Sequence, residues 1–180
     1  MPSDAPIIVV SGPGGVGKKT IADLVAAAFG RSVHLKADDL LASVVSGLVR
    51  PDSPEAEQQN EAIGGALAVS AMSFARDGYA TLVSGYLFPD GVAGLAAACG
   101  ERGLSCHYAV LMAGLETCWE RARGKVEGRW PPEFEPVANV HDRFSGLELD
   151  DRHVIDAAGP ASTVSGAVLA AFRAGNLEVR

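Results

Sequence analysis

Short apolar runs alternate with amphipathic stretches along the whole chain, and this alternation predicts strands and helices that follow one another in turn. The apolar runs predict five strands, at residues 7–10, 32–36, 79–84, 107–112 and 153–156. Because a helical pattern follows each run, we expect an α/β fold in which a parallel sheet is covered by helices on both faces.

The predicted helices are marked by apolar residues three or four positions apart and by residues that favour helix starts. The first helix follows the first strand and carries Ile21, Leu24, Val25 and Ala28. The others are expected at residues 40–49, from a Ser53 cap to residue 76, from an Asp90 cap to residue 100, at residues 116–123, and from a Ser162 cap onward. The helix that ends at residue 76 should pack one face formed by Leu67, Ser70, Ala71 and Phe74.

A glycine-rich loop with the spacing G-x-x-x-x-G-K joins the first strand to the first helix. The residues in order are Gly12, Pro13, Gly14, Gly15, Val16, Gly17, Lys18, Lys19 and Thr20. Glycines allow positive φ angles and close backbone approach, so successive backbone N–H groups can surround phosphate oxygens. The helix that follows offers its own unpaired N–H groups to the same anion, and Lys18 adds a positive charge. The loop therefore predicts a P-loop, or Walker A, site for a nucleotide.

Ligands of parallel α/β sheets bind beyond the carboxyl ends of the strands, so the residues that directly follow each strand are candidates for the site. Asp38 and Asp39 directly follow the second predicted strand. A carboxylate there can accept a proton from an attacking hydroxyl, or hold Mg²⁺ directly or through water. The alternative is that one of them only caps the helix that begins at Leu40.

Basic residues gather before and within the segment 124–136, whose Gly, Trp and adjacent prolines are typical of a mobile lid loop. The cations are Arg121, Arg123, Lys125 and Arg129. On a lid, such cations can close over phosphates and neutralise developing charge, and Arg121 is the first candidate. The alternative is a solvated helix end, where basic residues suit the negative end of the dipole.

Polar and aromatic residues elsewhere are candidates for contacts with a second substrate. Gln59 and Asn60 can bind hydroxyl groups, although an exposed polar turn of helix explains them equally well. Tyr86, with Phe88 and Trp130, can wall a pocket, although such residues are more often simple packing residues. No spacing of His or Cys indicates a zinc site.

Composition limits the class of protein. A length of 180 residues suits one domain, residues 1–180, and a hydrophobic content of 48% with a charged fraction of 21% is that of a globular protein. The net charge of −7 argues against a general nucleic-acid binder. The three cysteines form no C-x-x-C pair, which is typical of reduced thiols in a cytoplasmic protein. We expect no signal peptide and no membrane partner, and the oligomeric state stays open.

With these positions laid out, the chain resembles the small-molecule kinase group of P-loop proteins. That group includes chloramphenicol phosphotransferase-like, gluconate-kinase-like, shikimate-kinase-like and zeta-toxin-like enzymes. The resemblance rests on the loop at residues 12–18, on Asp38-Asp39-Leu40, on Asp77-Gly78-Tyr79 before the third strand, on residues 116–125 before the lid, and on Val154-Ile155-Asp156 before the last helix. The pair Gln59-Asn60 also occurs in uncharacterised ATP-binding relatives of this pattern.

The resemblance implies a three-layer P-loop fold with strand order 2-3-1-4-5 and a short lid. It implies that ATP donates its γ-phosphoryl group to a hydroxyl of a small molecule, such as an antibiotic, a sugar or a nucleoside. By position, Asp38 resembles the catalytic base and Arg121 the lid arginine, which would act on the nucleotide together with Lys18. Asp39, Gln59, Asn60 and Tyr86 would surround the acceptor.

Two positions depart from this family pattern, and both concern Mg²⁺. Lys19 stands where a Ser or Thr usually binds the metal, and Ser84 ends the third strand where many relatives have Asp. Three explanations stay open. Mg²⁺ is held by ATP oxygens, water, Thr20 and Asp38 or Asp39; the Lys19 ammonium partly replaces the charge of the metal; or the protein binds nucleotide without catalysis.

Overall fold

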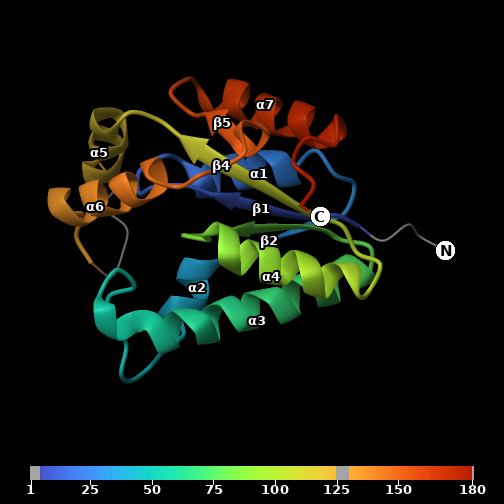
Figure 1. Ribbon diagram of the computed structural model, residues 1–180, viewed down its shortest axis with the longest axis horizontal. Coiled ribbons are helices and arrows are strands. Elements are labelled where there is room, and N and C mark those ends of the chain that lie inside the picture. Colours follow the sequence, from blue (N-terminus) through green and yellow to red (C-terminus); the bar gives the residue numbers. More distant parts are fainter. Residues whose placement is uncertain (1–4, 125–129, 180) are drawn as a thin grey trace.

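The computed structural model describes residues 5–124 and 130–179, and a five-stranded parallel sheet forms its centre (Figure 1). The strands are β1 (Ile7–Ser11), β2 (Ser32–Lys36), β3 (Ala80–Ser84), β4 (Cys106–Met112) and β5 (Val154–Asp156). Their order in the sheet is β2-β3-β1-β4-β5, and every pairing is parallel. The predicted α/β fold and strand order are confirmed.

Helices cover both faces of the sheet. They are α1 (Lys18–Ala26), α2 (Ala37–Ala42), α3 (Glu57–Arg76), α4 (Pro89–Gly100), α5 (Leu115–Arg123), α6 (Phe134–Ser145) and α7 (Ala161–Arg173), with short 3-10 turns at Pro54–Ala56 and Asp151–His153. Figure 1 shows α1 and α7 on one face, and α3 and α4 on the other. The helices α5 and α6 lie together beyond one end of the sheet (Figure 1).

The central strand shows why these apolar runs become strands with two buried faces. In β1, Ile8 and Val10 pack into the cluster shared with α1 and α7, whereas Ile7 and Val9 pack into the cluster shared with α3 and α4. All four side chains are fully buried. Neighbouring residues of a strand point to opposite faces, so a strand covered on both sides must be apolar throughout.

One predicted helix is much shorter than expected. The helix expected at residues 40–49 ends at Ala42, and the chain then runs irregularly to the 3-10 turn at Pro54. Val45, one of the apolar residues that suggested continuation, is 92% exposed and does not pack on the core. Gly47 has a φ of 73°, which a right-handed helix excludes. The prediction was wrong because apolar spacing alone does not show whether a packing partner exists.

Ser53 lies at the predicted N-cap position, before a 3-10 turn that begins at Pro54, but its side chain makes no capping hydrogen bond within the described residues. Asp90 and Ser162 are not caps, because α4 begins at Pro89 and α7 at Ala161, each one residue earlier. One predicted helix face also differs. The packed face of α3 contains Leu67, Ala71 and Ala75 at a spacing of four, whereas Phe74 is partly exposed and meets the Tyr79 ring edge-on. Proline is the first residue of the 3-10 turn at Pro54 and of α4 at Pro89, where its fixed φ suits a helix start.

The lid predicted at residues 124–136 is only partly described. Residues 125–129, including Lys125 and Arg129, lie outside the described residues. The loop was predicted to run to Pro136, but α6 already begins at Phe134. Pro136 fits the first turn of a helix, where a missing backbone N–H leaves no bond unmade. Within the described residues, no helix is long and apolar enough to cross a membrane.

Candidate functional site

The glycine-rich loop follows β1 and is packed tightly against β4 and α5. A Cβ on Gly12 would collide with the carbonyl oxygen of Leu111, and a Cβ on Gly15 with that of Cys118. Both glycines also have positive φ angles, 134° and 77°. These two positions require glycine because of both backbone conformation and space. The loop is therefore held in one shape by its surroundings.

The helix that follows leaves its N-terminus open to an anion. Gly17 precedes α1 with a φ of 104° in the left-handed region, and no side chain of the described residues caps the helix there. The first turn of α1 contains no acidic residue. The unpaired N–H groups and the positive end of the helix dipole are thus available to a phosphate group.

The Lys18 side chain folds back over this loop. Its Nζ donates hydrogen bonds to the carbonyl oxygens of Gly12 and Pro13, both at 2.8 Å. The same ammonium lies 4.4 Å from the centre of the Tyr86 ring, a cation–π contact. Lys18 is therefore held above the cradle in which an oxyanion would sit.

Lys19 and Asp38 form an ion pair beside the loop. Lys19 Nζ lies 2.6 Å from Asp38 Oδ2, and the two side chains are 50% and 59% exposed. Lys19 belongs to the first turn of α1 and Asp38 to the first turn of α2, so the contact joins the P-loop to the end of β2. Because both side chains are exposed, the ion pair adds little to the stability of the fold. What it determines is the position of the two side chains relative to each other.

A cavity of about 440 Å³ lies over the phosphate loop. The loop and the Lys19–Asp38 pair form its floor, and the end of β3 with Ser84 and Tyr86 forms one side. The other sides come from residues 48–52 after α2 and from residues 130–140, which include the start of α6. The cavity lies at the carboxyl ends of the strands, where the sequence predicted a site.

Tyr86 forms part of this cavity wall. The residue is 44% exposed, and it lies against the Lys18 ammonium and beside the loop. Partial burial of the side chain raises the pKa of Tyr86 to about 12, and the nearby carboxylates of Asp38 and Asp52 add to the effect. The phenol is thus a protonated hydrogen-bond donor at neutral pH, as expected for a wall residue.

Several predicted site residues do not line the cavity, among them Thr20, predicted for the nucleotide and the metal, and Asp39, predicted for the acceptor. Thr20 is exposed on α1, and Asp39 is exposed on α2; neither lines the cavity as the structure describes it. The fold brings Lys18, Lys19, Asp38 and Tyr86 together around the cavity. Along a helix, successive side chains point about 100° apart. Thr20 and Asp39 are therefore directed away from their neighbours.

Gln59 and Asn60 hold a loop instead of facing the cavity. The Gln59 amide pairs with both backbone groups of Val49: its Nε2 donates to the carbonyl oxygen at 3.1 Å, and its Oε1 accepts from the N–H at 3.0 Å. Asn60 Nδ2 donates to the carbonyl oxygen of Pro51 at 2.8 Å. Both amides thus fix the irregular segment after α2, which forms one cavity wall. The hypothesis that they bind substrate hydroxyls is not supported by these contacts.

Arg121 points toward a different loop. Its guanidinium donates to the carbonyl oxygens of Ala157 and Ala158, both at 2.8 Å, and to that of Gly159 at 3.5 Å. Arg121 is not among the described residues that line the cavity. It connects α5 to the loop between β5 and α7, so its predicted action on the transferring group stays a prediction without a contact that supports it.

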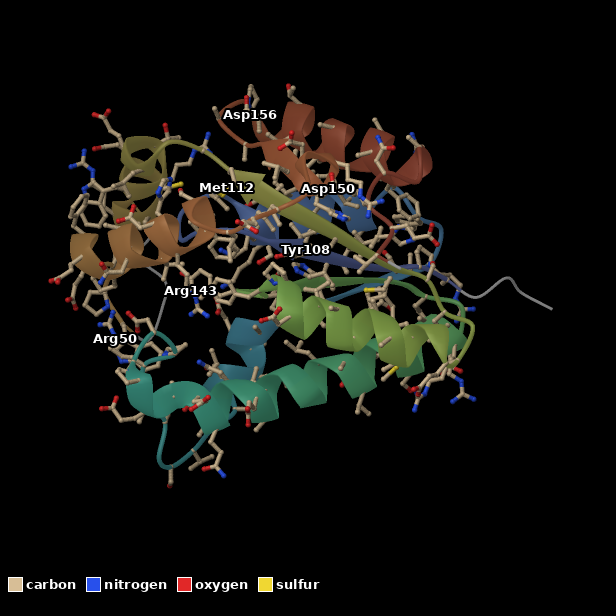
Figure 2. All side chains as sticks on the ribbon, viewed as in Figure 1. Arg50, Tyr108, Met112, Arg143, Asp150 and Asp156 are labelled. Atoms are coloured by element: carbon tan, nitrogen blue, oxygen red, sulfur yellow. The ribbon has the colours of Figure 1, made fainter. Side chains whose placement is uncertain are left out.

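Sequence reasoning missed a charged cluster in the cavity wall that residues 48–52 and 130–140 form, here called the far wall. Arg50 contacts the two carboxylate oxygens of Asp52 at 3.2 and 3.4 Å, and its Nη1 lies 3.2 Å from Glu133 Oε1. Figure 2 shows Arg50 on the loop after α2, on the side that faces α6. The partner Glu133 is 83 residues away in the chain, so no local pattern could have revealed the contact.

A second missed feature is a hydrogen-bonded chain behind the cavity. His34 Nδ1 lies 2.7 Å from Asp23 Oδ1, and His34 Nε2 lies 2.7 Å from Ser84 Oγ. Burial lowers the pKa of His34, against the opposing effect of Asp23, so the ring is neutral at pH 7. Its single N–H then faces the Asp23 carboxylate, and the Ser84 hydroxyl donates to Nε2.

The residues present do not fit a protein-held Mg²⁺. The position after Lys18 presents an ammonium, already paired with Asp38, where the metal needs an oxygen ligand. Ser84 offers a neutral hydroxyl whose proton is directed to His34. Thr20 lies outside the cavity, and among the described residues no three His, Cys, Asp or Glu side chains group as a metal site.

Comparison with known proteins supports the fold. No protein-family model and no curated protein sequence matches the chain. A gluconokinase structure from Sinorhizobium meliloti is similar with a TM-score of 0.63 and 19% identity, covering 98% of this chain and 95% of that one. The tunicamycin resistance protein of Deinococcus radiodurans has a TM-score of 0.63 and 21% identity, covering 98% and 99%. The Mycobacterium tuberculosis APS kinase in complex with AMPPNP and APS has a TM-score of 0.70 and 14% identity, covering 96% and 99%.

These similar structures share the architecture that the resemblance in sequence implied. The chain has the fold of P-loop small-molecule kinases, over nearly the full length of each comparison. At identities of 14–21%, the similarity shows a shared fold and does not by itself show a shared function.

Proposed function

We propose that the protein is an ATP-dependent phosphotransferase that moves a γ-phosphoryl group to a hydroxyl of a small molecule. One observation carries the proposal: the phosphate loop with Lys18 and the carboxylate of Asp38 line the same cavity. A phosphoryl donor and the base for its acceptor need this arrangement. The fold shared with gluconokinase and APS kinase supports the same reaction class.

The donor is bound by the loop. Backbone N–H groups at residues 12–18 and the N-terminus of α1 surround the phosphate oxygens, and Lys18 adds a charge that stabilises the transferring group. The acceptor hydroxyl oxygen attacks the γ-phosphorus, the bond to the ADP oxygen breaks, and the hydroxyl proton passes to Asp38. Positioning and electrostatics supply most of the catalysis.

The acceptor is, in our proposal, a neutral hydroxylated molecule with an apolar face. Arg50 is already paired with both Asp52 and Glu133, so this cluster carries a net negative charge and offers no unpaired cation. The remaining wall is apolar and rich in proline and aromatic side chains, namely Leu41, Leu48, Pro51, Trp130, Pro131, Pro132 and Val137. An anionic acceptor would need an unpaired cation here. A sugar, a nucleoside or an antibiotic fits this description, and one similar structure is a tunicamycin resistance protein.

A screen of hydroxylated metabolites and antibiotics for ADP release tests the proposal. We expect at least one neutral acceptor to be phosphorylated, and Asp38→Asn and Lys18→Met to lose about a hundredfold or more in kcat. Full turnover by Asp38→Asn on an identified acceptor would overturn the assignment of the base. Absence of ATP binding would overturn the function as a whole.

A second candidate is a nucleotide-binding protein without phosphotransferase activity. Lys19 and Ser84 favour it, since the two positions that usually hold Mg²⁺ are both altered. Calorimetry separates the candidates: ATP binding without turnover on any acceptor supports the second.

A further inference from the structure

We infer that the Lys19 ammonium takes the place of a protein-held divalent cation at the phosphate site, so that this protein binds ATP without needing Mg²⁺. The inference rests on the proposed function, because it presupposes that ATP binds at the loop. It goes further in assigning a role to a residue that breaks the P-loop pattern.

The position of Lys19 supports this role. Lys18 and Lys19 form the first turn of α1 and both line the cavity, so two cations border the cradle formed by the loop. At the second of these positions a P-loop normally presents a hydroxyl that binds Mg²⁺. An ammonium and a dication at the same place repel each other, whereas an ammonium and a phosphate oxygen attract.

Asp38 fixes the direction of the Lys19 side chain. Its Oδ2 lies 2.6 Å from Lys19 Nζ, which holds the ammonium between α1 and α2 at the floor of the cavity. A lysine ammonium has three donors, so Lys19 can keep Asp38 with one and bind a phosphate oxygen with another. Lys19 would then hold the carboxylate beside the phosphoryl group that its acceptor attacks.

Ser84 removes the other usual anchor of the metal. It ends β3 and lines the cavity, but its proton is directed to His34 Nε2, and His34 is itself held by Asp23. Its hydroxyl oxygen can accept a hydrogen bond from a ligand, but it supplies none of the negative charge that an aspartate would contribute. The neutral Ser84 lacks the negative charge of an aspartate, and Lys19 adds a positive charge. Both changes make the site less favourable for a divalent cation.

ATP titrations by calorimetry, in excess EDTA and in excess MgCl₂, test the inference. For the unaltered chain we expect affinities that agree within about threefold in the two conditions. Lys19→Met should lose about tenfold or more in EDTA, because a charged hydrogen bond to phosphate is lost. Lys19→Ser restores a hydroxyl and should bind ATP about tenfold more tightly with Mg²⁺ than with EDTA.

Two further variants control for charge and folding. Lys19→Arg keeps a cation and should keep affinity that does not depend on the metal. Arg31→Gln also removes one positive charge, but from the loop before β2, where Arg31 lies over the Tyr79 ring, and it should bind ATP like the unaltered chain. Circular dichroism and thermal unfolding of each variant confirm that the fold is intact.

The outcomes separate the two proposals. If ATP affinity of the unaltered chain falls about tenfold or more in EDTA, the inference about Lys19 fails while the proposed function stands. Unchanged affinity of Lys19→Met in EDTA also overturns the inference. If ATP binds in neither condition, the proposed function fails, and the inference fails with it.

Discussion

The Nε2 of His34 lies 2.7 Å from the hydroxyl oxygen of Ser84, across the boundary between β2 and β3. This contact connects a cavity residue to the exposed carboxylate of Asp23 on α1, through a ring that is only 6% exposed. The neutral ring accepts this hydrogen bond from the Ser84 hydroxyl, whereas a protonated Nε2 would donate to Ser84 Oγ and reverse its direction. Protonation of His34 therefore changes the hydrogen bonding of Ser84, which lines the cavity.

The stability of the protein should fall below neutral pH, and His34 should carry part of the loss. Burial lowers the pKa of His34 below its ordinary value of 6.5, and that of His107 likewise. Below about pH 6.5 the unfolded chain therefore binds more protons than the folded one. The contribution of these two histidines to the free energy of unfolding is fully present above this pH and is lost as pH falls below it. Urea unfolding between about pH 7.5 and pH 5 measures the slope.

The contribution of His34 is isolated by substitution. His34→Gln removes the titrating ring and should flatten the pH dependence, while His107→Gln removes the other contribution. A pH dependence of His34→Gln that equals that of the unaltered chain would contradict the assignment. Loss of stability at every pH is expected as well, since Asp23 and Ser84 both lose a partner.

Gly15→Ala should destabilise the protein by about 3 kcal/mol, the sum of a positive φ and a steric collision. A Cβ at this position would meet the backbone carbonyl of Cys118, which cannot rotate away. Gly65→Ala is the matched control: Gly65 lies exposed inside α3 with no atom near a new Cβ, so alanine should stabilise by about 0.5–1 kcal/mol. Equal effects of the two substitutions on denaturant unfolding would show that the loop is not packed as described.

Much of the fold could be predicted from the sequence, and the site could be predicted only in part. Continuous apolar runs identify strands buried on both faces, and the glycine spacing identifies the loop, because both depend on local chemistry. Residues such as Arg50 and His34 depend on partners 83 and 50 positions away. Gln59 also defeated prediction, because an amide that binds backbone has the same sequence pattern as one that binds a ligand.

Gln59→Ala should loosen the cavity wall after α2 without weakening the binding of ATP. The amide makes two hydrogen bonds to Val49, so its loss should cost about 1–2 kcal/mol and free residues 43–50. Thermolysin, which cuts before apolar residues, should cleave this segment faster. Gln58→Ala, an exposed neighbour on α3, serves as control and should leave the cleavage rate unchanged. A tenfold loss of ATP affinity in Gln59→Ala would point instead to a direct ligand contact.

Tyr86 should support ATP binding through its ring more than through its hydroxyl. Tyr86→Phe keeps the ring 4.4 Å below the Lys18 ammonium and should change ATP affinity by less than about threefold. Tyr86→Leu removes the cation–π contact and should weaken binding by about fivefold. Because the pKa of Tyr86 is about 12, affinity should show no step from its ionisation below about pH 10. A larger loss in the Phe variant would show that the phenol hydroxyl itself binds the nucleotide.

Arg121 should act on stability before it acts on catalysis. Its guanidinium donates to three consecutive carbonyl groups of the loop between β5 and α7, and a charged donor of this kind is worth about 1.5–3 kcal/mol. Arg121→Met should therefore lower the free energy of unfolding by about 2 kcal/mol. Arg123→Met removes the same charge from the same helix, but within the described residues Arg123 pairs only with exposed Glu120, so this control should change stability by about 0.5 kcal/mol or less.

Kinetics then distinguish the role of Arg121 predicted from sequence from the role that its contacts support. A residue that only positions the loop should affect KM for ATP more than kcat, whereas a residue that touches the transferring group should lower kcat by about a hundredfold. Since the guanidinium is directed to Ala157 and Ala158 and does not line the cavity, we expect the first pattern. A selective loss of kcat, with stability unchanged, would mean that Arg121 leaves these carbonyl groups when ATP binds.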